Sequence, residues 1–194
     1  IMEGDVFAYS GIDAIVIPAS TTDIHSYAFR GLTNLKVYVE YGNTMGISSG
    51  SKSSFYGATS ATVVTMSCSG GAISSGTLFV SNIITKIPSG AFQNCNALTS
   101  LNIEADSSLM LIDDKAFYQA TSLTALTIPA SVTRLGNDAF HGCSSLSSVI
   151  FESDSYLKSI GRHSFEGTAF SSITIPASVT FLGDSMFYGC TNLP

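Results

Sequence analysis

The sequence predicts an elongated repeat solenoid, and two observations carry this prediction. The first is internal repetition. Residues 128–140 (IPASVTRLGNDAF) and 175–187 (IPASVTFLGDSMF) are identical or near-equivalent at ten of thirteen positions, and residues 17–29 follow the same frame. The second is composition, because charged residues make up only 11% of the chain, against about 25% in ordinary globular domains. In stacked β-strands, small uncharged side chains pack against equivalent side chains of the neighbouring strands, so few charged residues are needed.

The repeats are spaced regularly along the chain. Aligning them on their last phenylalanine gives spacings of 22, 26, 37, 25, 23, 25 and 22 residues, and all but one fit the 20–29-residue period of a leucine-rich repeat. We therefore predict an α/β-type leucine-rich-repeat solenoid over residues 1–194, with about eight repeats. Its short parallel β-strands are stacked in one sheet, and turns and single helical turns form the other side. The eight anchors are Phe7, Phe29, Phe55, Phe92, Phe117, Phe140, Phe165 and Phe187.

Within each unit the apolar residues alternate nine and eleven positions after the phenylalanine, as Leu126 and Ile128 do. This alternation is typical of a short strand with one face buried. Next come a glycine that permits a sharp turn (Gly136, Gly161, Gly183) and, beside it, residues that could cap a single helical turn (Asp113, Asn137, Asp184).

Two segments depart from this frame, and the chain stops within a unit. Residues 67–79 lengthen one unit and are expected to form an inserted loop or hairpin that protrudes from the stack. In Leu35–Tyr41 the apolar register shifts by one residue. Because the last unit is incomplete and no polar cap is evident at either end, we expect the natural protein to be longer, or its last coil to expose apolar surface.

The pattern I-P-A-S-V-T-x-L-G-x-x-A-F-x-G-C-x-x-L-x-x-V, which spans residues 128–149, resembles the BspA-like subclass of leucine-rich repeats. That subclass occurs in surface antigens of bacteria and of some parasitic protozoa. The resemblance covers nearly the whole chain and implies a right-handed solenoid displayed at the cell surface or secreted. It is specific for the fold and weak for the function, because the subclass includes adhesins and many uncharacterised proteins.

Charge and motifs argue against several classes of function. The net charge of −6 and the eight scattered basic residues disfavour nucleic acid, which needs clustered Lys and Arg. No apolar run is long enough for a membrane helix, so no membrane insertion is expected within this segment. No serine is paired with a plausible His and Asp at a recognisable nucleophile elbow, and no paired metal-ligand spacing occurs. We therefore expect no enzymatic activity, no cofactor and no metal.

The cysteines and histidines have plainer interpretations. Cys95, Cys143 and Cys190 share one repeat position, and their spacing places them about two coils apart, too far for a bridge to each other. They are expected to be small buried hydrophobes. Cys68 in the insertion is the only plausible pairing or reactive thiol. The histidines (His25, His141 and His163) are expected to be exposed turn residues, with His141 and His163 at different corners, and the pair Asp113–Asp114 to be turn and cap residues.

The outward strand positions form the main candidate site. If they share one sheet, they make a smooth, uncharged face, and repeat proteins often bind partners across such a face. The plainer alternative is a merely solvated β-ladder. The face is expected to contain Val63, Thr65, Ser100, Asn102, Ala125, Thr127, Ser148, Ile150, Ser172 and Thr174.

An aromatic patch of Tyr38, Tyr41 and Tyr56 is the second candidate, because Tyr is enriched at recognition sites. The alternative is local packing where the register shifts. The function predicted is a non-enzymatic protein-binding or adhesion module of a surface or secreted protein, with a host or extracellular-matrix protein as the hypothesised partner. A structural spacer that displays another domain, with no ligand of its own, is the alternative.

Overall fold

The computed structural model divides the chain into two compact units, residues 1–66 and residues 67–194. Each unit is described by itself below. The structure describes residues 14–18, 20, 21, 24, 28, 29, 32, 35–39, 62–65, 67, 68 and 73–194.

The first unit contains a parallel sheet of three strands in the order β1-β2-β3. Consecutive repeats supply β1 (Ala14–Ile17), β2 (Lys36–Val39) and β3 (Thr62–Thr65), with Ala14 opposite Lys36 and Lys36 opposite Thr62. Ile17, Phe29, Leu35 and Val37 are fully buried. Leu35 and Val37 are both buried, so the inward positions of β2 follow the shifted register that the sequence indicates.

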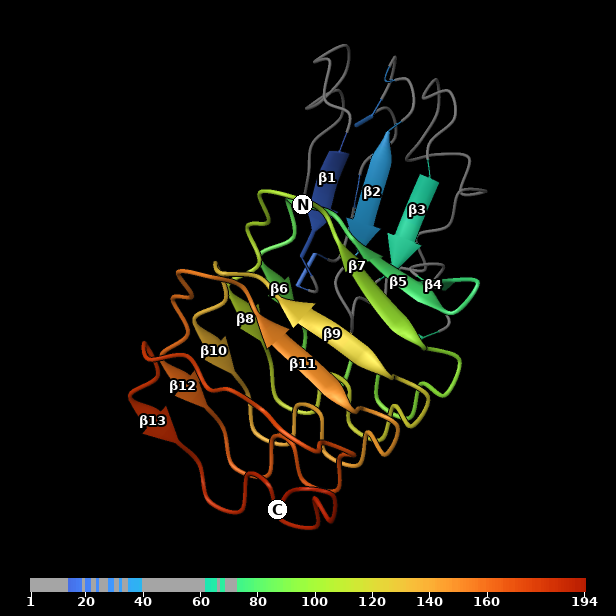
Figure 1. Cartoon of the computed structure of the whole chain (residues 1–194). Coiled ribbons are helices and arrows are strands. Elements are labelled where there is room, and N and C mark those ends of the chain that lie inside the picture. The colour runs from blue at the N-terminus through green and yellow to red at the C-terminus, as the bar shows by residue number, and fades with distance from the viewer. Residues whose placement is uncertain are drawn as a thin grey trace. The chain divides into compact units, whose positions relative to one another are not determined.

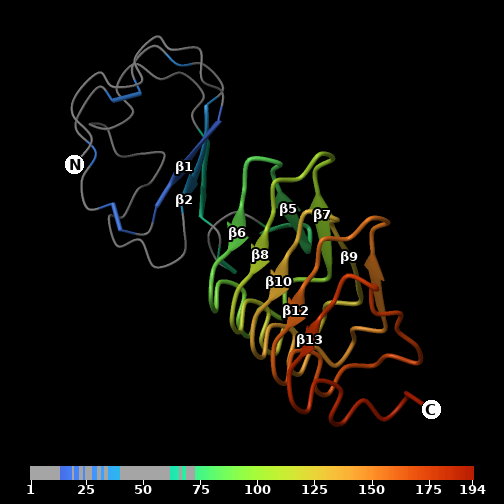
Figure 2. The ribbon, with the colours of Figure 1, turned by 90° about the vertical axis from the view of Figure 1, so that its left-hand side faces the viewer.

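The second unit is a β-solenoid whose coils build two sheets (Figures 1 and 2). The first sheet has the order β11-β9-β7-β5-β4. Strands β5, β7, β9 and β11 pair in parallel, whereas β4 and β5 form an antiparallel hairpin. The strands are β4 (Ile73–Ser74), β5 (Thr77–Val80), β7 (Ser100–Ile103), β9 (Ala125–Ile128) and β11 (Ser148–Phe151).

The segment expected as an insertion therefore contributes to this sheet. Ser75 and Gly76 connect β4 to β5 with φ values of 49° and 81°, and two consecutive positive φ values are typical of a tight type I′ hairpin turn. β5 then pairs along its whole length with β7, beginning with Thr77 opposite Ser100. Residues 77–80 thus form a regular strand of the stack and do not protrude from it.

The second sheet is built from two-residue strands in the order β13-β12-β10-β8-β6, all parallel. The expectation of a single sheet was wrong for this unit, because the two-residue segment that ends five residues before each phenylalanine also forms a ladder, with Leu135 opposite Ile112 and Ile160. The strands are β6 (Lys86–Ile87), β8 (Leu111–Ile112), β10 (Arg134–Leu135), β12 (Ser159–Ile160) and β13 (Phe181–Leu182).

The repeated phenylalanines form one stacked row in this unit. The ring centroids of Phe92 and Phe117 are 5.4 Å apart, those of Phe117 and Phe140 are 5.2 Å apart, and those of Phe140 and Phe165 are 5.4 Å apart, with interplanar angles of 11° or less. Phe187 continues the row at 6.1 Å from Phe165. These five anchors therefore occupy equivalent positions in successive coils, as the repeat frame predicts. Phe29 is buried in the first unit, and Phe7 and Phe55 lie outside the described residues.

The phenylalanines lie in hydrogen-bonded turns, and no helix is found in the part of the chain that the structure describes. The residue two before the anchor has a positive φ, as at Lys115 (57°) and Asp138 (54°). A left-handed residue breaks a right-handed helical run and turns its N–H outward. The Lys115 N–H then donates to the Asn137 carbonyl of the next coil at 2.9 Å. These turns are therefore bonded between coils as well as within them.

Candidate protein-interaction surface

The outward positions of the first sheet in the second unit form two rows across its strands, which we call the sheet face. The strand register places Thr77, Ser100, Ala125 and Ser148 in one row. In the second row, Phe79 lies opposite Asn102 and Thr127 lies opposite Ile150. The face carries no charged residue, and its largest side chains are Phe79, 51% exposed, and Ile150, 59% exposed.

Side-chain alternation along each strand creates this face. In β9, for example, Leu126 and Ile128 point into the core and are 4% and 0% exposed, whereas Ala125 and Thr127 are exposed. Ser100 is half-buried, and its hydroxyl lies 3.0 Å from that of Thr77 on the neighbouring strand. The face is thus a surface of hydroxyls and small apolar groups, supported from beneath by a closely packed core.

Six of the ten predicted face residues lie together on β7, β9 and β11, in the second unit. Val63 and Thr65 lie on β3 of the first unit, and their side chains are outside the described part of the structure. Ser172 and Thr174 are exposed but belong to no strand. The six are Ser100, Asn102, Ala125, Thr127, Ser148 and Ile150. Sequence reasoning missed Thr77 and Phe79, although the alternation in Thr77–Val80 matches that of the other strands.

The predicted aromatic patch is not supported at the one position that the structure describes. Tyr38 is only 5% exposed, although it follows the inward Val37 on β2 and points to the opposite face of the strand. A buried ring cannot contact a partner, so local packing is the correct interpretation of Tyr38. Tyr41 and Tyr56 lie outside the described residues.

Carboxylates lie at one end of the first sheet, just after two of its strands end. Glu104 follows β7 and Glu152 follows β11, and each carboxylate accepts hydrogen bonds from the preceding coil. Glu104 Oε2 binds the Ser81 hydroxyl and the Asn82 N–H, both at 3.0 Å, and Glu152 Oε2 binds the Ala130 N–H at 2.9 Å. Two residues after each glutamate, Asp106 and Asp154 are exposed. The sheet face is therefore neutral, with negative charge at one border.

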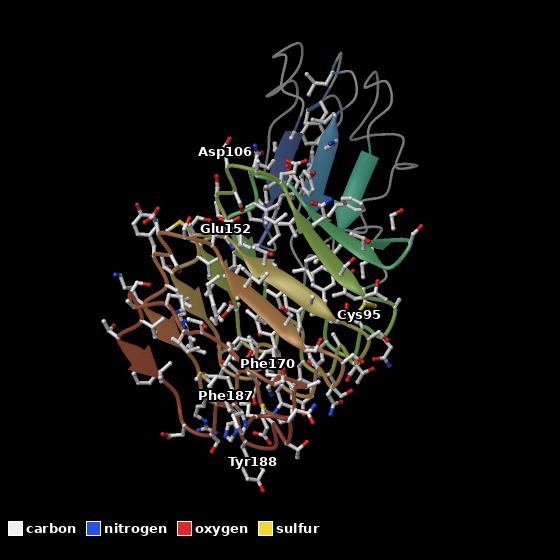
Figure 3. The ribbon with its side chains drawn as sticks, viewed as in Figure 1. Cys95, Asp106, Glu152, Phe170, Phe187 and Tyr188 are labelled. Atoms are coloured by element: carbon white, nitrogen blue, oxygen red, sulfur yellow. A yellow bond between two sulfur atoms is a disulfide. The ribbon has the colours of Figure 1, made fainter. Side chains whose placement is uncertain are left out.

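Two clefts open beside these carboxylates. A cleft of about 460 Å³ lies between residues 101–107 and 127–131. A larger one, of about 780 Å³, lies between residues 147–155 and 171–178, and we call it the β11 cleft. Figure 3 labels Asp106 and Glu152, which both line the smaller cleft. Clefts of roughly 300–1,000 Å³ are typical of ligand sites.

The cysteines divide into a bridged pair and two buried thiols. Cys68 and Cys95 form a disulfide, which supports the expectation that Cys68 is a pairing residue and corrects the expectation that Cys95 is a simple buried hydrophobe. Cys95 lies in the core of its turn while Cys68 lies at the surface. Cys143 and Cys190 are free and buried, as expected. Burial raises the pKa of the Cys143 thiol to about 12, so this group is a poor nucleophile at neutral pH.

His141 and His163 lie at the same corner, not at different ones. Both are half-buried around Glu166, with His163 Nδ1 hydrogen-bonded to Glu166 Oε2 and His141 Nδ1 3.6 Å from the same oxygen. The repeat spacing aligns His141 and Glu166 one residue after their phenylalanines, and this equivalence could have revealed the pairing. Asp114 lies in a turn, as expected, and its Oδ1 accepts the Asn137 N–H of the next coil at 2.7 Å, so it links two coils. His25 lies outside the described residues.

Neither a metal centre nor a membrane span is found in the described residues. No group of three or more His, Cys, Asp or Glu side chains there is placed to hold a metal ion. Over the same residues, no helix is long and apolar enough to cross a membrane.

The stacked parallel strands, the phenylalanine row and the open sheet face define a repeat protein with a leucine-rich-repeat type of β-solenoid. The chain belongs to the BspA type leucine rich repeat family, whose model matches residues 1–82 and 73–194 with six copies of the repeat. This family is in general a non-enzymatic protein-interaction fold. No curated protein sequence matches the chain.

Several solved structures resemble this one. The pneumococcal vaccine antigen PcpA matches with a TM-score of 0.56 and 27% identity over 59% of this chain and 28% of its own. A leucine rich cell surface protein of Faecalibacterium prausnitzii matches with a TM-score of 0.50 and 23% identity, covering 95% of this chain and 47% of that one. A leucine-rich repeat protein of Eubacterium ventriosum has a TM-score of 0.54 and 21% identity, covering 92% and 59%. The chain therefore spans between about a quarter and three fifths of the length of these proteins.

Proposed function

We propose that this chain is a protein-binding module, displayed at the cell surface or secreted, that contacts a host or extracellular-matrix protein through the sheet face. The observation that carries the proposal is the exposure of Phe79 and Ile150 on an otherwise flat, uncharged surface. Binding surfaces combine apolar centres with neutral hydrogen-bonding groups and are depleted of charge at their core. The amide of Asn102 and the hydroxyl of Thr127 supply such groups on the two strands between the apolar side chains.

The cell-surface location is supported by two further observations. The Cys68–Cys95 disulfide suits an oxidising environment, because disulfides persist outside the cytosol and are rare within it. Among the matched structures, one is a vaccine antigen and another a cell surface protein. Both observations favour export.

The test introduces a charged, bulky side chain on the face without disturbing the core. Phe79→Arg and Thr127→Arg replace exposed residues two strands apart, and Met110→Arg serves as the control, because Met110 is 54% exposed beside the second sheet. Attachment to a panel of immobilised matrix proteins and to intact host cells is measured for the purified variants, after circular dichroism has established that they are folded.

We expect both face variants to lose attachment at least tenfold, since burying an unpaired charge at an interface costs several kcal/mol. The control should bind as the unchanged protein does. Attachment that is equally strong in all four proteins would remove the sheet face from consideration. No attachment by the unchanged protein to any member of the panel would leave the spacer as the better description.

A further inference from the structure

The β11 cleft is bordered by a strand edge that the fold leaves without a neighbour. Sheet order ends at β11, although the chain continues beside it through residues 171–175. Within residues 73–194, all of which the structure describes, no backbone hydrogen bond joins Ser148–Phe151 to this following segment. The last bond between the two coils before the cleft runs from the Ala169 N–H to the Leu146 carbonyl at 2.9 Å.

The segment between the end of a strand and the next buried apolar residue, which we call a corner, is alternately long and short, and this alternation explains where the sheet opens. In the long corners Leu109 follows Ile103 by six residues and Leu157 follows Phe151 by six, whereas in a short corner Val132 follows Ile128 by four. Each long corner begins with a glutamate whose N–H donates the last backbone hydrogen bond of the strand to the preceding coil. Glu104 donates to the Val80 carbonyl at 2.9 Å, and Glu152 donates to the Ile128 carbonyl at 3.1 Å.

A short corner begins instead with a proline, Pro129 or Pro176. Proline has no N–H, so the equivalent bond to the preceding coil cannot form. At the first such junction, β7 and β9 pair only between Ser100 and Ala125, and the smaller cleft opens beyond that pair. At the second junction no strand pair forms at all. Both prolines line the clefts that they open.

The second opening is wider because its coil is one residue shorter. Leu146 follows Phe140 by six residues, but Phe170, which is fully buried like Leu146, follows Phe165 by only five. The strand segment that follows is therefore out of register with β11. Beyond this segment, the hydroxyl of Ser178 also differs from its counterpart in its hydrogen bonding. Its counterpart Ser131 donates its hydroxyl to the Leu109 carbonyl at 2.8 Å, whereas the Ser178 Oγ is buried without a hydrogen-bond partner.

Backbone groups of β11 point into the opening. The Glu152 N–H is directed toward β9, and because the peptide group is trans, the Phe151 carbonyl is directed the opposite way, toward the cleft. Successive residues of a parallel strand bond to alternate sides, so the N–H and carbonyl of Val149 also point there. Such unpaired edges are templates for an added strand.

The side chains that line the cleft indicate which strand would fit. Its walls combine hydroxyls such as Ser148, Ser172 and Thr174 with the apolar Ile150 and Ile173. Glu152 and Asp154 line one end, and no Lys, Arg or His is among the lining residues. The site is therefore neutral along its length and negative where β11 ends.

We propose that the β11 cleft binds an extended peptide segment of a partner protein, which adds as a strand to β11 and carries a lysine or arginine beside Glu152 and Asp154. Main-chain hydrogen bonds to Val149 and Phe151 hold the peptide, and the carboxylates select its basic end, as in other cases of strand addition. This inference rests on the proposed binding function and adds the local chemistry of the partner.

The experiment uses the full chain and a fluorescent peptide, acetyl-KTVTVTK-amide, whose lysines at both ends serve either strand direction. Binding is measured by fluorescence anisotropy at low ionic strength, up to about 1 mM peptide. Two control peptides accompany it. One is methylated on every backbone nitrogen of its five central residues, so that neither of its edges can donate to β11, and the other has glutamate in place of both lysines.

We expect saturable binding of the lysine peptide and at least tenfold weaker binding of both controls. In the protein, Ser172→Arg places a bulky cation in the cleft and should abolish binding, whereas Ser144→Arg, a substitution at an exposed turn, should not. Glu152→Gln keeps the acceptor for the Ala130 N–H and removes the charge, and it should weaken binding about two- to fivefold. Asp184→Asn, which neutralises an exposed carboxylate outside the cleft, is its matched control.

Three outcomes would overturn the proposal: no binding of the lysine peptide, equal binding of the methylated peptide, or equal binding to the Ser172→Arg protein. Concentration-dependent dimerisation that Ser172→Arg abolishes would assign the edge to a second copy of this chain instead. Phe79→Arg, which lies on β5, should leave peptide binding unchanged. The experiments can therefore reject peptide binding at the β11 cleft while they support partner binding at the sheet face, or the reverse.

Discussion

The phenylalanine row provides the sharpest test of how this solenoid is stabilised. Phe140 is fully buried between Phe117 and Phe165, with ring centroids at 5.2 and 5.4 Å. Phe140→Leu keeps most of the apolar volume but removes both aromatic pairs. Each such pair contributes about 0.5–1.5 kcal/mol beyond its area burial, so we expect the free energy of unfolding to fall by about 1–3 kcal/mol. Phe140→Ala adds the cavity and should cost about 3–5 kcal/mol.

The matched control is the same change at the end of the row. Phe187 is only half-buried, and its centroid distances to Phe165 and Phe170 are longer, 6.1 and 6.4 Å. Phe187→Leu should therefore cost about 1 kcal/mol or less. Urea denaturation followed by circular dichroism and tyrosine fluorescence provides the measurement, since the chain has eight tyrosines and no tryptophan. Equal losses for the two leucine variants would refute a stacked row that stabilises its middle more than its end.

Two further predictions concern the packing of the coils. The raised pKa of Cys143, about 12, means that the unfolded thiol, with a pKa near 8.5, ionises first as the pH rises. Stability should fall by about 1.4 kcal/mol from about pH 7.5 to 9.5 relative to Cys143→Ala, and a parallel pH dependence in both proteins would contradict the burial. Gly161→Ala should cost about 3 kcal/mol, because its Cβ would lie 2.5 Å from the Gly136 backbone. Gly167→Ala, whose Cβ would come no nearer than 3.8 Å to another residue (the Gly142 Cα), should cost only about 1 kcal/mol for its φ of +66°. Similar losses in the two variants would argue against close coil contact.

The repeat pattern was sufficient to predict the coils and their interior. Leu126 and Ile128 were predicted to be on the buried face of a strand, and each is less than 5% exposed. These positions are determined by periodicity, which is a local property of the sequence. The row of five stacked phenylalanines follows from the same periodicity, because coils of similar length place equivalent residues side by side.

The second sheet and the turn conformation could not be predicted in this way. A two-residue strand such as Arg134–Leu135 has no alternation to detect, and it exists only because adjacent coils supply matching residues. The left-handed conformation of the turn residues could not be predicted either, because Lys115 and Gln119 are not residue types that favour positive φ. Their conformation is favoured by hydrogen bonds to the next coil, which are tertiary interactions.

The core depends on the regular repeat, whereas the candidate cleft depends on departures from it. Where every coil repeats the one before, each backbone group of the sheet finds its partner in the neighbour, and nothing remains to bind another molecule except side chains. An opening requires a departure from the repeat, and the chain has two kinds: a proline in place of a glutamate after the strand, and the missing residue before Phe170. Pro176 removes a donor to β11, and the shorter coil shifts the next segment out of register. Because both departures coincide at β11, the larger cleft lies there, and the proline at Pro129 without a shortened coil opens only the smaller one.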